Sequence, residues 1–399
     1  MPSRPGQPHA SLIGWLSLTQ LISWGSVFYL FGLLLEPVEQ DLGLSRAEAS
    51  LAFSLGLLAE GLLAWPVGRW IDSGRERVVM TLGSLILASG LVLHSLIESR
   101  TGYYAVWLLL GAGLSATLYS PAFAVVIRRY PHDFRRAIIV ITFLGGLAST
   151  VFLPLTAWLI AHLGWRHALW PLAALHLLVC APIHALVLRQ APQPRAGPIS
   201  TSKPGLRHHV LSAPYLLVGV FIVLLMGVTA ALPAHMVSLL RSYGLAETWV
   251  IAVPATVGLL QVGGRALLFF FERHLNLHLV NRLIPCLIPL GLLILLLAPL
   301  AGTFQIALVV VFVVVYGMGN GMLTIVKGTA VAEYVDREQA ASLNGALGLP
   351  MALGRAATPW LLGLMWTPQD AYTHGLLLML VISVLGVLAL ALAQRRART

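Results

Sequence analysis

Charged residues are scarce in this sequence, and their scarcity restricts the class of protein it can encode. Only 10% of the 399 residues are Asp, Glu, Lys or Arg, while 58% are hydrophobic; soluble domains are about a quarter charged. Apolar runs of about 20 residues follow one another, and each is long enough to cross a hydrocarbon core about 30 Å thick. The composition excludes a soluble globular protein and predicts an all-α integral membrane protein.

Cysteine is nearly absent, and the chain has no nucleotide-binding loop. Cys180 and Cys286 stand alone within apolar runs, without the CxxC or CxxH spacing of a metal site. No GxxxxGK[ST] sequence occurs, which argues against an ATP-driven pump. No cluster of His, Asp or Ser within the apolar runs suggests an enzyme. We therefore expect no catalytic residue, no metal and no cofactor.

Positive charge is in excess, with 25 Lys and Arg against 15 Asp and Glu and a net charge of +10. The arginines lie between the apolar runs and not on one basic face, so we expect no nucleic-acid partner. With both termini in the cytoplasm, the outer loops keep only four arginines; these are Arg46, Arg100, Arg166 and Arg241. This distribution follows the positive-inside rule. It predicts an integral protein of a bacterial-type cytoplasmic (inner) membrane, with the lipid bilayer around it. We expect the protein to be a monomer.

The apolar runs divide the chain into about twelve membrane-spanning helices. They are predicted at residues 12–35, 47–67, 78–97, 103–127, 137–163, 168–188, 213–240, 245–271, 280–300, 304–330, 340–366 and 371–393. A polar, proline-rich stretch separates the sixth helix from the seventh. We therefore predict an N-terminal six-helix bundle (1–190), a cytoplasmic linker (191–212) and a C-terminal six-helix bundle (213–399).

The two halves carry similar short motifs in the same order along the chain. The matching pairs are Gly56-Leu-Leu-Ala-Glu-Gly61 with Gly258-Leu-Leu-Gln-Val-Gly263, Gly111-Ala-Gly113 with Gly317-Met-Gly319, and Pro154 with Pro359. Such a duplication predicts two pseudo-symmetric bundles. Repeats of this size are typical of transporters whose substrate site lies between the halves.

Two arginines lie deep within predicted helices. A cation at the bilayer centre costs roughly 2.5 to 3.5 kcal/mol to insert, so Arg265 in the eighth helix needs a reason to be there. Gln261 lies four residues earlier, on the same helical face. Arg355 is about 15 residues into the eleventh helix, or about 20 to 25 Å along it. Because the planar fork of Arg suits a carboxylate, we predict an anion-binding site. The alternative for Arg265 is a side chain that snorkels to the cytoplasmic surface.

Neutral and aromatic residues within the predicted helices are candidates for lining the site. Asn320 stands between two glycines in the tenth helix, and Tyr29 and Tyr119 lie in the first and fourth. We predict substrate contacts for all three, although a single aromatic residue more often serves packing.

Glu60, His235 and Lys327 are further ionisable candidates within the predicted helices. Glu60 is a candidate for coupling a proton or for neutralising a buried cation. His235, beside Pro233, is a candidate for a proton relay, with a structural role as the alternative. Lys327 lies closer to the cytoplasmic end, and we expect it to snorkel or to form a structural ion pair.

The loop after the second helix reads Gly68-Arg-Trp-Ile-Asp72-Ser-Gly-Arg75-Glu-Arg77. It resembles the signature loop of the major facilitator superfamily, although Ser73 stands where a cation is usual and the loop is one residue shorter. The resemblance implies a twelve-helix fold, secondary transport by alternating access, and a cytoplasmic gate formed by Gly68, Asp72, Arg75 and Arg77. The alternative is a positively charged loop that only caps a helix.

A narrower resemblance rests on Phe134-Arg-Arg-Ala137 before the fifth helix and on Arg265. Both are similar to bacterial relatives of the monocarboxylate and oxalate/formate carriers. Gln261 stands where monocarboxylate carriers have an Asp linked to proton coupling, and Arg355 matches a cation that oxalate/formate carriers have in the eleventh helix.

The sequence as a whole predicts a secondary active transporter, not an enzyme, that moves a small organic anion, with a carboxylate as the expected class. A coupling proton is a further expected partner. The alternatives are an efflux carrier for amphipathic drugs and a non-transporting membrane receptor or sensor.

Overall fold

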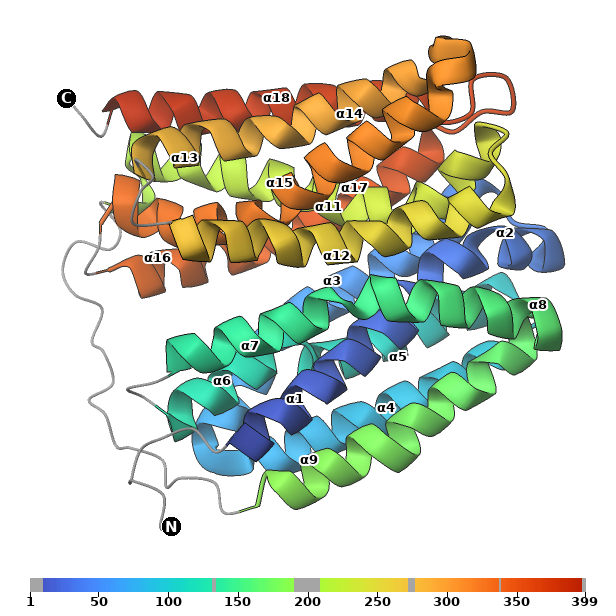
Figure 1. Ribbon diagram of the computed structural model, residues 1–399. Helices are drawn as coiled ribbons and strands as arrows, with labels where there is room; N and C mark the ends of the chain where they lie inside the picture. Colours follow the sequence, from blue (N-terminus) through green and yellow to red (C-terminus); the bar gives the residue numbers. More distant parts are fainter. Residues whose placement is uncertain (1–9, 131–133, 190–208, 272–276, 337–338, 397–399) are drawn as a thin grey trace. The chain divides into compact units, whose positions relative to one another are not determined.

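The computed structural model describes residues 10–130, 134–189, 209–271, 277–336 and 339–396. These residues form helices joined by short turns (Figure 1). The chain divides into two compact units, Met1–Ala196 and Gly197–Thr399. Most of the predicted linker (191–212) lies outside the described residues.

The N-terminal unit consists of nine α-helices and three π-helical turns among its described residues. They are α1 (Ala10–Ser23), η1 (Trp24–Phe28), α2 (Leu30–Leu42), α3 (Arg46–Trp70), η2 (Ile71–Arg75), α4 (Glu76–Ser95), α5 (Arg100–Thr117), α6 (Tyr119–Arg129), α7 (Phe134–Gly146), α8 (Ala148–Leu175), η3 (His176–Cys180) and α9 (Ala181–Val187).

The C-terminal unit contains long α-helices and two 3₁₀-helical segments. The elements are α11 (Ala213–Ser242), α12 (Glu247–Phe271), α13 (Leu277–Leu283), η5 (Ile284–Cys286), α14 (Leu287–Leu297), η6 (Ala298–Phe304), α15 (Gln305–Tyr334), α16 (Ala340–Ala346), α17 (Gly348–Leu364) and α18 (Thr373–Arg396).

Eight stretches of the described chain are long and apolar enough to cross a membrane. Three of them, Arg46–Ser95, Arg136–Val187 and Leu279–Tyr334, contain 50, 52 and 56 residues, about twice what one crossing needs. The first turns at Gly74 (φ 87°) and the second at Gly164 (φ 74°), a conformation that only glycine adopts without steric cost. The third is interrupted by η6. With α16 and α17 as a further crossing, the predicted twelve-helix, all-α membrane fold is confirmed.

The fourth predicted helix differs from expectation because it breaks at Leu118, between α5 and α6. Pro121 has no N–H, so it cannot donate to the carbonyl of Thr117 four residues earlier. Gln20 on α1 donates from Nε2 to the Thr117 carbonyl oxygen instead, over 2.6 Å. The proline thus explains the break, and a buried amide satisfies the carbonyl that the proline leaves exposed.

Helices pack in the same pairs in both units. α3 packs against α5 in the N-terminal unit, and α12 packs against α15 in the C-terminal unit. A Cβ atom added to Gly111 would overlap the carbonyl group of Gly56, and one added to Gly321 would overlap the carbonyl group of Gln261. The small residues shared by the two halves therefore serve the same close approach of backbones.

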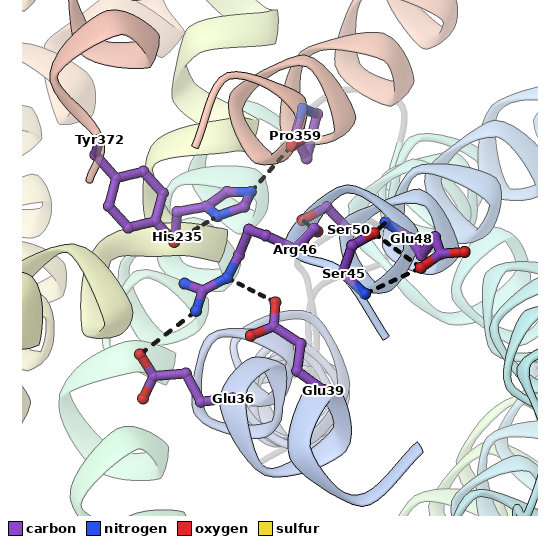
Figure 2. A network of polar contacts seen from close by, with 9 residues as sticks. All are labelled: Glu36, Glu39, Ser45, Arg46, Glu48, Ser50, His235, Pro359 and Tyr372. Atoms are coloured by element: carbon purple, nitrogen blue, oxygen red, sulfur yellow. Dashed lines mark hydrogen bonds and ion pairs between the residues drawn. The ribbon is translucent and has the colours of Figure 1, made fainter. Parts of the chain in front are cut away.

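The turn between α2 and α3 is fixed from both sides. Gly43 ends α2 in the left-handed conformation (φ 62°), and Ser45 and Glu48 form a capping box at the start of α3. Arg46, the first residue of α3, reaches back to α2, where its Nε lies 2.6 Å from Glu39 Oε1 and its Nη2 lies 3.9 Å from Glu36 Oε1 (Figure 2).

Candidate functional site

Arg265 lies where α12 approaches α15 closely. A Cβ atom added to Gly321 would overlap the backbone of Gln261, and one added to Gly264 would lie 2.6 Å from the Met318 carbonyl oxygen. Glycine at these positions lets the two helices come together. Arg265 Nε donates a hydrogen bond to the Gly321 carbonyl oxygen over 3.4 Å, and the residue is only 9% exposed. The guanidinium is thus held against the neighbouring helix.

Gln261 is also buried, at 7% exposed, one turn before Arg265 on α12. Thr324 on α15 donates its hydroxyl proton to the same Gly321 carbonyl oxygen, over 2.5 Å. The Gly321 carbonyl oxygen therefore accepts from a guanidinium and from a hydroxyl at the α12–α15 contact, with buried Gln261 one turn before Arg265.

One face of α15 continues this polar region. Asn320, Thr324 and Lys327 are spaced four and three residues apart, so they lie on the same side of the helix. Asn320 and Lys327 are half-buried and Thr324 is exposed. The predicted site residue Asn320 thus shares its helical face with Lys327, which the sequence analysis assigned to a structural role.

Arg355 on α17 is half-buried, and its positive charge repels that of Lys327. Within the described part of the chain, Lys327 has no salt bridge to an acid, so the expected structural ion pair is not found there. Acids are also missing along these helices: α15 has none before Glu333, and α16 and α17 have none at all. Glu247, in the first turn of α12, pairs with Arg241 at 2.5 Å. The C-terminal unit therefore carries an excess of positive charge along α12, α15 and α17.

His235 on α11 is fully buried and bonded through both ring nitrogens (Figure 2). Nε2 donates to the Pro359 carbonyl oxygen over 2.9 Å, and Nδ1 lies 3.1 Å from the Tyr372 hydroxyl oxygen. Because a tyrosine hydroxyl both donates and accepts, the ring keeps both contacts with or without a proton on Nδ1. His235 thus links α11 to α17 and to the residue before α18.

Tyr29 and Tyr119 belong to one series of aromatic side chains in the N-terminal unit. The ring of Trp24 lies 4.9 Å from that of Phe28 and 5.0 Å from that of Tyr119. Phe28 in turn lies 5.3 Å from Tyr29. Both predicted tyrosines are half-buried, and Tyr119 also stacks on Phe123 with the ring centroids 5.3 Å apart. Glu60, on α3, is half-buried as well.

The residues of the expected gate lie at the end of α3 and in the turn to α4. Asp72, Arg75 and Arg77 are exposed. The buried acid of this loop is Glu76, which is 0% exposed. Its carboxylate lies 3.0 Å from Arg128 Nη1 and 2.6 Å from Arg129 Nη2 on α6, and Arg128 also donates to the Ile71 carbonyl oxygen.

Glu76 was missed in the sequence analysis, which placed Asp72 in the gate and did not consider Glu76. The available signal was the pair Arg128-Arg129 at the end of the fourth helix, two adjacent cations that need a counter-charge. A buried, doubly paired carboxylate joins the third and fourth membrane-spanning helices at this end of the unit.

Two units of long apolar helices, with matching internal packing and a buried arginine within a long apolar helix of one of them, define a membrane transport protein built from a repeat. A model of the Major Facilitator Superfamily matches residues 16–359. The chain belongs to this superfamily, whose members are carriers and not enzymes.

Curated relatives are similar over parts of their length. The chain is 32% identical over 142 residues to monocarboxylate transporter 13 of Bos taurus, covering 34% of this chain and 33% of that protein. It is 33% identical over 174 residues to the gallate transporter of Pseudomonas putida, covering 40% and 38%. The chain thus matches about a third of the length of these relatives.

Solved structures share the fold over nearly the whole chain. A bacterial homologue of the lysosomal transporter Spinster, in an inward-facing and occupied conformation, superposes with a TM-score of 0.76 at 17% identity, covering 99% of this chain and 98% of that one. The nucleoside transporter NupG superposes with a TM-score of 0.74 at 17% identity, covering 96% and 98%. At this identity the likeness is one of fold alone.

Proposed function

We propose that this member of the superfamily transports a small organic anion and that it recognises a carboxylate group. The observation that carries the proposal is Arg265, a buried guanidinium that hydrogen-bonds to the Gly321 carbonyl oxygen of the next helix. A carbonyl is a neutral acceptor, so this contact orients the guanidinium without cancelling its charge. A buried charge attracts an anion more strongly than an exposed one, because the effective dielectric constant is lower than in water.

The charge of the surrounding helices supports an anion over a cation. Arg265, Lys327 and Arg355 place three positive charges on α12, α15 and α17, and α15 has no acid before Glu333. A lipophilic cation would meet repulsion here, whereas an organic anion is attracted. The bidentate geometry of Arg favours a planar carboxylate.

The names of two curated relatives also support a carboxylate substrate. One is named for monocarboxylates and the other for gallate, an aromatic carboxylate, although each alignment covers about a third of the relative.

In the proposed mechanism, Arg265 and Arg355 hold the anionic group while Gln261 and Asn320 orient it by hydrogen bonds. Tyr29 and Tyr119 are the proposed substrate contacts of the N-terminal unit. Transport proceeds by alternating access, which exposes the solute to one side of the membrane and then to the other. Gly68, Asp72, Arg75 and Arg77 form the proposed gate at the cytoplasmic side of an inner membrane, with both termini in the cytoplasm.

Glu60 and His235 are candidates for the coupling proton. The hydrogen bonds of His235 suit this role because neither is lost when Nδ1 is protonated. A Glu60→Gln variant that keeps counterflow but loses proton-driven uptake would support coupling through Glu60.

A second candidate is efflux of amphipathic drugs, and the aromatic series that joins Tyr29, Phe28, Trp24 and Tyr119 favours it. Aromatic faces bind flat apolar solutes without demanding a charge.

Counterflow in proteoliposomes separates the two candidates. Vesicles loaded with unlabelled lactate, gallate or malonate should accumulate the labelled form of the same anion from outside. Tetraphenylphosphonium should neither exchange nor compete. Exchange of tetraphenylphosphonium without exchange of any carboxylate would contradict anion transport and favour the efflux carrier.

A further inference from the structure

The first and sixth membrane-spanning helices of the N-terminal unit each contain a π-helical turn, and the two turns meet at one hydrogen bond. The turns are η1 (Trp24–Phe28) and η3 (His176–Cys180). Ser26 Oγ in η1 lies 2.8 Å from His176 Nε2 in η3. π-helical turns are rare and occur frequently at functional sites. The proposed anion site uses neither residue, so this contact needs a separate explanation.

The hydrogen bonds of Ser26 fix the tautomer of His176. The Ser26 hydroxyl donates its single proton to the Ile22 carbonyl oxygen over 2.7 Å. Its oxygen therefore accepts a hydrogen bond from the N–H group at His176 Nε2. The remaining nitrogen, Nδ1, is buried without a hydrogen-bond partner among the described residues, and His176 is 0% exposed. The lone pair on Nδ1 is therefore the position at which this ring can take up a proton.

His184, two turns further along the same helix, lies between two hydroxyl groups. Its Nδ1 is 2.9 Å from Ser84 Oγ on α4, and its Nε2 is 3.2 Å from Thr19 Oγ1 on α1. Both hydroxyls donate to backbone carbonyls of their own helices. Two hydroxyl oxygens therefore face the ring as acceptors, which matches a ring that carries a proton on both nitrogens. When one proton leaves, either hydroxyl can turn and donate to the ring.

Polar side chains connect these two histidines along the contact of α1 with η3 and α9. Thr19, Ser23 and Ser26 are spaced four and three residues apart, so they share one face of the first helix. The span from Thr19 to Ser26 is about 10 Å, close to the roughly 12 Å from His184 to His176 at 1.5 Å per residue. The Ser23 hydroxyl is buried without a hydrogen-bond partner among the described residues. It lies on the first helix between the two hydroxyls that contact the histidines.

We call the contact of the first helix (α1 and η1) with η3 and α9 the seam. Few other ionisable groups of the described residues face it. Cys180 is fully buried between the two histidines on the same helix, and α1 carries no charged residue among its described positions. On α4, Glu76 is held by Arg128 and Arg129, and His94 lies near the other end.

Three further elements pack nearby. On α7, which packs against α1, Arg136 lies in the first turn and is exposed. On α8, Arg166 and His167 precede His176 by ten and nine residues. On α5, the charged residue is Arg100 at its first position. The two histidines are thus the groups best placed to change charge within the seam.

We propose that His184 and His176 bind the proton that is coupled to transport. A proton adds to the free nitrogen of one imidazole to give an imidazolium. The proton is released when the same ring gives up an N–H proton and returns to the neutral imidazole. No other bond forms or breaks. This inference rests on the proposed transport function, because it names the coupling ion and its site.

The test is proton-driven uptake of labelled gallate and lactate in proteoliposomes. One coupled proton supports about tenfold accumulation of a monoanion per pH unit of gradient. We expect accumulation by the wild-type protein and a ratio near one for His184→Gln and His176→Gln, while gallate counterflow without a gradient continues. The control is His94→Gln, which removes another fully buried histidine of the same unit and should accumulate substrate like the wild type.

Two further arms make the result decisive. Ser26→Ala and Thr19→Val keep both rings and should weaken accumulation even if the histidine variants fail to fold. ¹⁵N NMR of histidine-labelled protein needs no substrate: His176 should carry its proton on Nε2 at high pH, and lowering the pH should convert the His176 and His184 signals to those of imidazolium. Full accumulation by both histidine variants, or rings whose signals stay neutral down to the pH at which the protein unfolds, would overturn the inference. An absence of carboxylate transport with titrating rings would instead count against the proposed function alone.

Discussion

Arg265 Nε on α12 donates a hydrogen bond to the backbone carbonyl oxygen of Gly321 on α15 over 3.4 Å. The relationship depends on Gly321, because any side chain there would meet the carbonyl group of Gln261. The close packing of α12 against α15 therefore also positions the buried Arg265 guanidinium, which we propose binds the anion.

Gly321→Ala is expected to separate α12 from α15. The added Cβ would overlap the Gln261 backbone, which cannot move without moving the helix. Overpacking of this kind costs typically about 1 to 3 kcal/mol, and the Arg265 hydrogen bond should weaken with it. Thermal unfolding in detergent and gallate counterflow should both decline. Gly263→Ala is the matched control, because a Cβ there meets nothing within 4 Å.

Lys327→Gln is expected to reduce anion transport while leaving stability unchanged or improved. Lys327 shares a helical face with Asn320, and the charge of Arg355 acts on it. Removing one of two neighbouring like charges relieves repulsion, but it also lowers the attraction for an anion. The Km for exchange should rise, and the midpoint of thermal unfolding should not fall. A lower midpoint with unchanged Km would show that Lys327 is structural.

Glu76→Gln should destabilise the N-terminal unit far more than Asp72→Asn. The Glu76 carboxylate is buried between Arg128 and Arg129, so its neutralisation leaves two cations without their acid. Loss of one partner from a buried ion pair costs about 3 to 5 kcal/mol. Asp72 is exposed, and its replacement should alter transport rate without a comparable fall in stability. Equal stabilities of the two variants would contradict this reading of the loop.

Gln20→Leu should destabilise the chain, and Pro121→Ala should suppress part of that effect. The Gln20 amide satisfies the Thr117 carbonyl that Pro121 cannot reach. An unsatisfied buried carbonyl costs about 1 to 3 kcal/mol. Alanine at position 121 restores an N–H donor to the helix, so the double variant should lose less stability than the sum of the two single changes. A double-mutant cycle measured by thermal unfolding checks this; strict additivity would contradict it.

Much of the fold was predictable because membrane-spanning helices leave long apolar runs and charged loops. Patterns of that kind predict the turn near Gly74 and the turn between α11 and α12. They also predict that the glycines of α3, α5, α12 and α15 lie at helix contacts. The break at Leu118 was not predicted. Its sign in the sequence is Pro121, three residues later, and the Gln20 amide that satisfies the freed Thr117 carbonyl lies on another helix.

The sites were less predictable than the helices. Arg265 and Gln261 stand out because polar groups are rare in apolar runs, and both are buried. The His176–Ser26 and His184–Thr19 contacts join residues 150 and 165 positions apart. Nothing in local periodicity specifies which face of the sixth helix meets which face of the first, so these contacts could be recognised only from the packed structure.

The most direct measurement of the central claim is counterflow of labelled gallate and lactate by Arg265→Gln, Arg265→Lys and the wild type, reconstituted at equal amounts. A hydrogen bond to a charged group contributes about 1.5 to 3 kcal/mol, so Arg265→Gln should raise Km by about 10- to 100-fold. Arg265→Lys should fall between, because it keeps the charge but loses the planar fork. Arg241→Gln, which alters the exposed pair with Glu247, should behave like the wild type. Unchanged Km and rate for Arg265→Gln would contradict the account.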